Sequence, residues 1–244
     1  RGGKIMRFAV ITFPGSNCDQ DCYHVTDNIF GIETDMLWYE DEIKLSDYDC
    51  VMLPGGFSYG DYLRSGAIAR FAPLMDKVIE YANNGGLVLG ICNGFQILLE
   101  AGLLPGAMKV NNNLKFVCKD IDLEVVNAET PFTNQTDKGE KITLPVAHGE
   151  GNYYIDDKGL ADLKKNNQIV LRYLNDQENP NGSVDNIAGI CNKEGNIFGL
   201  MPHPERAAEE ILGSKTADGY KIFSSIIEYL KEKSSNKRGE KIES

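Results

Sequence analysis

The chain has 244 residues, 42% of them hydrophobic and 25% charged, with a formal net charge of −11. This composition fits one large globular domain and excludes disordered, fibrous and disulfide-stapled miniprotein classes. An acidic surface repels phosphate backbones and disfavours nucleic-acid binding. No apolar run approaches the roughly 18 residues that a membrane-spanning helix needs.

The ends of the chain differ from its body. We expect a single domain over residues 6–230, because no linker rich in Gly, Ser and Pro divides it. Residues 1–5 precede the first Met and are interpreted as a cloning remnant or extension, and the basic, almost apolar-free residues 231–244 predict a frayed tail. Six scattered cysteines and the lack of a secretory leader indicate reduced thiols in the cytoplasm.

The first hundred residues alternate between strand and helix patterns. A β-branched and aromatic run over 7–13 predicts a buried strand, and Asn17 or Asp19 is expected to cap the helix that follows. Strands are predicted at 34–39, 49–53 and 87–91, and helices at 68–82 and 95–100. This order is typical of an α/β fold with a mostly parallel central sheet and helices on both faces.

After residue 109 the pattern changes. Alternating residues over 109–126 predict a small antiparallel portion at one side of the same domain. Further strands are predicted at 168–174, 187–191 and 197–201, and an amphipathic helix at 220–230.

The most informative motif is Gly-Ile-Cys-Asn-Gly at residues 90–94. It places Cys92 at a strand end where a helix begins at once, as in a nucleophile elbow, whose sharp turn needs small neighbours. The helix N-terminus favours the thiolate. A structural cysteine beside a glycine turn is the alternative, but the position of the motif favours a nucleophile.

A thiolate nucleophile needs a base, and the chain has three histidines. His24 lacks a partner pattern, whereas His148 and His203 each precede a glutamate by two residues, a spacing that puts both side chains on one side of an extended chain. We favour His203 with Glu205, because Pro202 and Pro204 stiffen its loop. His148 lies among glycines, and we interpret it as a structural or substrate-loop residue in a flexible turn.

An acyl transfer also needs donors for the oxyanion. Gly55 and Gly56 end a predicted strand at the carboxyl edge of the sheet, where open α/β sheets bind ligands. Asn93 supplies the amide directly after the nucleophile. Gln96 lies one helical turn beyond Cys92, and is either a substrate contact or a helix-surface glutamine.

A metal site is not expected. Cys18, Cys22 and His24 leave a tetrahedral zinc one ligand short.

In this chain order, Pro-Gly-Gly at 54–56, the Cys92 elbow and His203-Pro204-Glu205 resemble class I glutamine amidotransferases. Longer runs at 13–19, 55–66 and 145–151 are similar to one family in that class, the glutaminase subunits of phosphoribosylformylglycinamidine synthase from purine biosynthesis. The resemblance covers about residues 6–230.

The resemblance implies a flavodoxin-like class I glutaminase fold and a reaction. Cys92 would attack the side-chain amide carbon of glutamine, His203 would move the protons and Glu205 would orient it. Gly56 and Asn93 would form the oxyanion hole. Gln96 would contact the substrate.

The resemblance also implies partners. Ammonia would pass to a separate ATP-dependent synthetase subunit, which converts formylglycinamide ribonucleotide to its amidine, in a complex with a small third subunit. ATP and Mg²⁺ are expected on the synthetase and no cofactor on this chain. Residues 58–65 and the His148 loop are expected to face the partners.

Two other functions stay open. A γ-glutamyl hydrolase would use the same elbow and base. A non-catalytic redox-sensing binding protein would use Cys92 as its switch, but would not need a carboxylate-oriented histidine.

Overall fold

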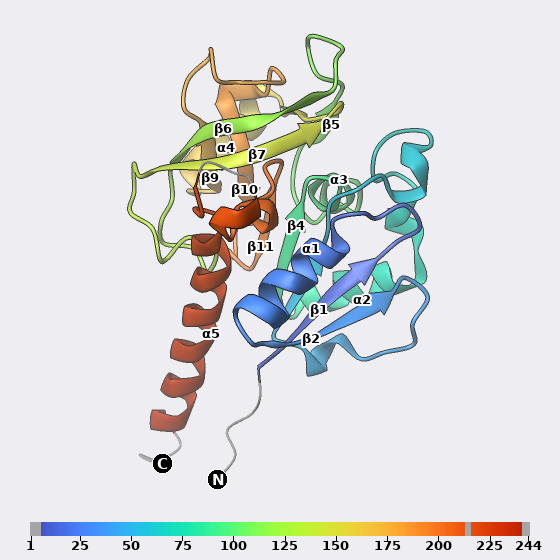
Figure 1. The fold of residues 1–244 in the computed structure, drawn as a ribbon, viewed down its shortest axis with the longest axis vertical. Coiled ribbons are helices and arrows are strands. Elements are labelled where there is room, and N and C mark those ends of the chain that lie inside the picture. The colour runs from blue at the N-terminus through green and yellow to red at the C-terminus, as the bar shows by residue number, and fades with distance from the viewer. Residues whose placement is uncertain (1–5, 213–215, 241–244) are drawn as a thin grey trace.

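The fold is built around one mixed sheet (Figure 1). A computed structural model of the chain describes residues 6–212 and 216–240. The sheet has nine strands in the order β2-β1-β3-β4-β11-β10-β9-β6-β7, and β5 and β8 form a separate antiparallel pair. The strands are β1 Arg7–Thr12, β2 Glu33–Trp38, β3 Cys50–Leu53, β4 Leu87–Ile91, β5 Ala107–Lys109, β6 Val117–Val125, β7 Lys141–His148, β8 Asn152–Tyr154, β9 Ile169–Tyr173, β10 Ile187–Cys191 and β11 Ile197–Leu200.

The two halves of the sheet differ in strand direction. Strands β2, β1, β3, β4 and β11 are parallel neighbours, and β11, β10, β9, β6 and β7 pair antiparallel. In the parallel half, β3 and β4 are buried along their whole length, as expected for strands covered on both faces. The predicted fold class is therefore confirmed: a flavodoxin-like α/β fold with an antiparallel portion at one side.

Helices cover both faces of the sheet. Figure 1 shows α1 on the near side of the parallel strands and α2 behind them. The helices are α1 Asp19–Tyr23, α2 Pro73–Asn83, α3 Asn93–Glu100, α4 Asp157–Lys165 and α5 Tyr220–Glu240. The segment that continues α1, His24–Ile29, is a π-helix. None of the helices over the described ranges is long and apolar enough to cross a membrane.

Some predicted boundaries were wrong. The N-cap of α1 is Cys18, with no side-chain cap, rather than Asn17 or Asp19. The periodic stretch 68–82 is not one helix, because Ala72 is extended and α2 begins at Pro73, whose missing N–H suits a first helical position. The structure continues α5 to Glu240, through part of the tail for which fraying was predicted, and the fraying itself stays a prediction. Residues 1–5 and 241–244 lie outside the described ranges.

The elements β7, β8 and α4 were not predicted. Pro145 interrupts the pattern of β7, because a proline cannot donate to a ladder. It is tolerated because β7 is the edge strand of the sheet and pairs only with β6.

Candidate active site

The site lies where parallel strands end. Cys92 follows β4, the loop with Gly55 and Gly56 follows β3, and His203 follows β11. Because these strands are parallel neighbours, their carboxyl ends meet at one edge of the sheet.

Cys92 occupies a strained turn between β4 and α3. Its φ of 49° and ψ of −103° lie outside the regions that non-glycine residues normally adopt. The backbone N–H of Cys92 donates to the carbonyl of Leu200 at 2.8 Å, which ties the turn to β11. Gly94 makes the turn possible, since a Cβ there would lie 1.9 Å from the carbonyl oxygen of Leu53. The nucleophile elbow predicted from the sequence is therefore present.

His203 and Glu205 form a buried pair. The His203 Nδ1 lies 2.6 Å from Oε1 of Glu205, and the two residues are 2% and 1% exposed. The His203 backbone N–H donates to the Pro145 carbonyl at 2.8 Å, which fixes the loop against β7. With Nδ1 held by the carboxylate, Nε2 is the nitrogen left for proton transfer.

Two opposing effects set the protonation of His203. Burial disfavours the imidazolium, but the Glu205 carboxylate and the neighbouring Cys92 thiol outweigh it and raise the pKa of His203 well above its ordinary value. The Nε2 atom has no hydrogen-bond partner among the described residues. The arrangement favours an imidazolium that can give a proton to a leaving group.

The two predicted oxyanion donors follow neighbouring parallel strands, Gly56 after β3 and Asn93 after β4, and their role as an oxyanion hole stays a prediction. Gly56 has a φ of 143°, and a Cβ there would lie 2.7 Å from the backbone nitrogen of Asn17. The flanking bonds run from Phe57 N–H to Gly15 and from Asn17 N–H to Gly55, so none of the backbone bonds in the described chain uses the Gly56 amide. The Asn93 amide is at the first position of α3, where N–H groups have no intrahelical partner.

Gln96 is buried rather than on the helix surface, so the surface alternative was wrong. Its side chain is 4% exposed. The Nε2 group donates to the carbonyl of Glu150 at 2.6 Å, and Oε1 accepts from Nδ2 of Asn93 at 2.9 Å. Contact with a substrate stays a prediction.

His148 differs from its predicted setting. It is the last residue of β7 and 3% exposed, not part of a flexible turn. Its Nδ1 lies 3.1 Å from Oδ1 of Asn111 and its Nε2 lies 3.4 Å from Nδ2 of Asn181. Burial, with the charge of His203, lowers the pKa of His148 to about 4. This histidine is held neutral.

The sequence analysis missed Cys18 as a neighbour of the His203–Glu205 pair. Its Sγ, a ring nitrogen of His203 and an oxygen of Glu205 lie within 4.8 Å of one another, and all three residues are buried. Burial raises the pKa of the Cys18 thiol. Cys18 comes six residues after the end of the parallel strand β1. This position was the available signal that Cys18 lies at the same carboxyl edge of the sheet as Cys92 and His203.

Cys18, Cys22 and His24, which were not expected to bind zinc, do not form a group of metal ligands among the described residues. His24 lies 2.8 Å from Glu209, while Cys18 belongs to the His203 neighbourhood. Arg206 Nη2 lies 2.9 Å from Cys18 Sγ and places a positive charge beside that group, which disfavours a cation. That the chain uses no metal stays a prediction.

Comparison with known proteins assigns the class first. A family model described as CobB/CobQ-like glutamine amidotransferase domain matches residues 5–230. The chain is similar to a Salinibacter ruber protein named phosphoribosylformylglycinamidine synthase subunit PurQ, 55% identical over 92% of this chain and 97% of that one. A Moorella thermoacetica protein of the same name is 58% identical over 92% and 96%.

A solved structure agrees with these relatives. The structure of PurLQS from Thermotoga maritima matches with a TM-score of 0.83 and 50% identity, over 92% of this chain and 99% of that one. The chain belongs to the PurQ family of glutamine amidotransferase subunits.

Proposed function

We propose that this chain hydrolyses the side-chain amide of glutamine to glutamate and ammonia through a thioester on Cys92. The observation that carries the proposal is the strained elbow of Cys92 beside a buried His203–Glu205 pair at one sheet edge. A redox sensor has no use for a carboxylate-held imidazolium.

Each step uses groups of this chain. The Cys92 thiolate attacks the amide carbon, and the oxyanion that forms is stabilised by the amides of Gly56 and Asn93. The His203 imidazolium gives its proton to the leaving nitrogen, which departs as ammonia. A water then loses a proton to His203 and attacks the thioester, releasing glutamate and the thiolate. Glu205 keeps the His203 ring in one orientation throughout.

Ammonia is the product that a partner subunit would consume. We propose that it passes to a synthetase subunit, which uses ATP and Mg²⁺ to convert formylglycinamide ribonucleotide to its amidine. A small third subunit completes the assembly. No step on this chain calls for a cofactor. The cytoplasm is the proposed compartment, on the scattered spacing of the cysteines.

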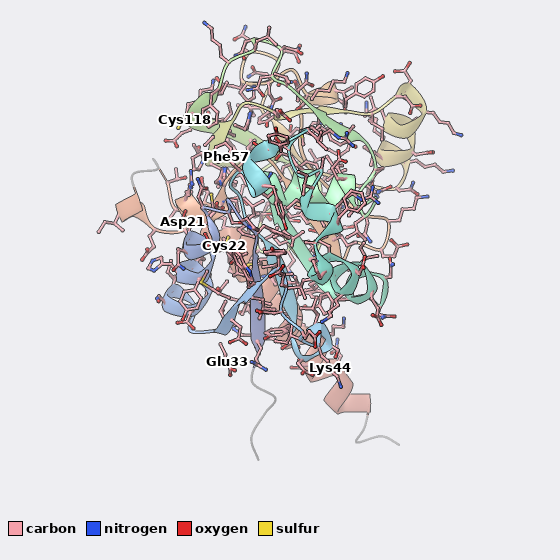
Figure 2. All side chains as sticks on the ribbon, turned by 90° about the vertical axis from the view of Figure 1, so that its right-hand side faces the viewer. Asp21, Cys22, Glu33, Lys44, Phe57 and Cys118 are labelled. Atoms are coloured by element: carbon pink, nitrogen blue, oxygen red, sulfur yellow. The ribbon has the colours of Figure 1, made fainter. Side chains whose placement is uncertain are left out.

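A docking surface for the synthetase lies beside the site. Phe57 and Phe116 form a ring pair with centroids 6.5 Å apart, and both are about half exposed. Figure 2 shows Phe57 near β6, the strand that carries Cys118. On the same loop as Phe57, Tyr62 and Leu63 are 74% and 84% exposed. Large apolar side chains exposed on one loop favour an interaction surface.

This surface adjoins the oxyanion loop, so we expect docking to assist catalysis. Turnover by the chain alone should then be weak. Tyr62→Asp should weaken co-elution with the synthetase and reduce activation, while leaving the slow activity of the isolated chain unchanged. Strong activity of the isolated wild type would contradict the coupling.

The substrate test compares glutamine with γ-glutamyl dipeptides. Wild type and Cys92→Ala are assayed for glutamate release, with circular dichroism to establish folding. Preference for free glutamine, abolished by Cys92→Ala, would support the proposal. Preference for the dipeptides would favour a γ-glutamyl hydrolase, and no hydrolysis by folded wild type with its partners would favour the sensor.

A further inference from the structure

The side chain of Asn93 has contacts that the reaction scheme above does not use. It is 1% exposed. The Oδ1 atom accepts from the backbone N–H of Ser58 at 3.1 Å, while Nδ2 donates to Oε1 of Gln96 at 2.9 Å and lies 3.4 Å from Oδ1 of Asp61. One carboxamide thus joins helix α3 to the loop that contains Gly56.

That loop is under backbone strain. Tyr59, Asp61 and Leu63 have φ values of 53°, 54° and 71°, in the left-handed region that disfavours residues with a Cβ. Each such residue is strained and persists only where its surroundings hold it. Ser58 lies two residues after Gly56, so its bond to Asn93 acts close to the proposed oxyanion donor.

The other end of the network is also fixed. Gln96 donates to the Glu150 carbonyl at 2.6 Å, and the Glu150 carboxylate accepts from the Ser65 N–H at 3.3 Å. The loop is therefore bound near its start by Asn93 and near its end by Glu150. Of these groups, only Asn93 also supplies a proposed oxyanion amide.

We propose that the Asn93 carboxamide is a positioning group that sets the Gly56 amide relative to the Asn93 amide. The two halves of the oxyanion hole come from separate segments, after β3 and after β4. The Asn93 side chain bonds one of these segments to the other. This inference rests on the proposed glutaminase function.

The test separates oxyanion stabilisation from thiolate reactivity. Asn93→Ala keeps the backbone amide but removes the bond to Ser58. We expect kcat for glutamine to fall about 100-fold, the scale of losing one oxyanion donor, with KM changed less than about 3-fold. Alkylation of Cys92 by iodoacetamide forms no oxyanion, so its rate, followed on the Cys92 peptide by mass spectrometry, should stay within about 3-fold of wild type.

Asn196→Ala is the matched control. Asn196 is also buried, donates to the carbonyls of Ala82 and Gly86 at 2.8 and 2.7 Å, and lies at the opposite end of β11. It should lower the thermal midpoint but not kcat. All variants are assayed as full chains, alone and with the synthetase subunits.

Three results would overturn the inference. Asn93→Ala with near-normal kcat would show that the side chain does not position the loop. A parallel loss of alkylation would show general damage to the elbow. Wild type that hydrolyses no glutamine under any condition would overturn the proposed function and this inference together, whereas the first two results leave the proposed function standing.

Discussion

Two buried histidines share the spacing His-x-Glu but have different hydrogen-bond partners. His148 and His203 are each followed two residues later by glutamate, and both are buried. His203 Nδ1 bonds to its own glutamate at 2.6 Å, whereas the carboxylate of Glu150 accepts from the Ser65 N–H instead. The ring of His148 lies between the carboxamides of Asn111 and Asn181.

The two rings differ in the group that faces Nδ1, an amide oxygen at His148 and a carboxylate at His203. Asn111 uses Nδ2 to donate to the carbonyls of Lys115 and His148, so its Oδ1 is the acceptor and His148 Nδ1 carries the proton. Nε2 of His148 then accepts from Asn181. A neutral acceptor cannot stabilise an imidazolium as the Glu205 carboxylate does. Burial and the charge of His203 therefore lower the pKa of His148, whereas at His203 the Glu205 carboxylate outweighs burial and the pKa is raised.

The largest expected effect is a difference in kcat between a variant of His203 and a variant of His148. His203→Ala should lower kcat about 10⁵-fold, because both proton transfers are lost, while His148→Gln should lower it less than about 10-fold. Steady-state glutamate release measures both. Equal losses would contradict the assigned roles.

A smaller effect is expected at the partner of His203. Glu205→Gln keeps an acceptor for Nδ1 but removes the charge that raises the pKa of His203. We expect a fall in kcat between about 10²- and 10⁴-fold, less than for His203→Ala. Losses of the same size in both variants would give Glu205 a role beyond orientation and charge.

The comparison also predicts a pH effect on stability. The unfolded chain protonates His148 below its ordinary pKa of 6.5, but the folded protein does so only near 4. The free energy of unfolding of wild type should therefore fall by about 3 kcal/mol relative to that of His148→Gln as the pH falls from 6.5 to 4. Urea titrations across this range measure the difference. Parallel curves for the two proteins would show that His148 is not held neutral.

The smallest effect concerns Asp61, beside Asn93. Burial raises the pKa of Asp61 to about 6 from 3.8, so folding favours the protonated form and the carboxylate is penalised at higher pH. Asp61→Asn should be more stable than wild type by about 1 kcal/mol above pH 6, a figure reduced because the group is partly exposed to solvent. The gain should vanish below pH 4. A gain that persisted there would have another cause.

The parallel half of the fold and the sharp turn at Cys92 could be predicted because their signals are local. Strands β3 and β4 are continuous apolar runs, β1 contains one over residues 8–11, and glycines at 90 and 94 flank the Cys92 turn. His203 was favoured for the stiffness of its loop, and its partner was two residues away.

What could not be predicted depends on distant contacts. Pro145 interrupts the strand pattern of β7, so β7 was not predicted and His148 was placed in a flexible turn. The asparagine partners of His148 come from segments 37 and 33 residues away in the chain. Cys18 lies beside His203 and Glu205, although 185 residues separate it from His203 in the chain. The burial of Gln96 follows from the packing of α3 against the Glu150 loop, which no spacing on the helix shows.

The most direct test of the central claim is glutamate release from glutamine by wild type and Cys92→Ala, with and without the synthetase subunits, formylglycinamide ribonucleotide and ATP. The account predicts wild-type activity that rises sharply with the complete complex and is absent in Cys92→Ala. Glutamine hydrolysis that is indifferent to the synthetase, or that survives the loss of Cys92, would contradict it.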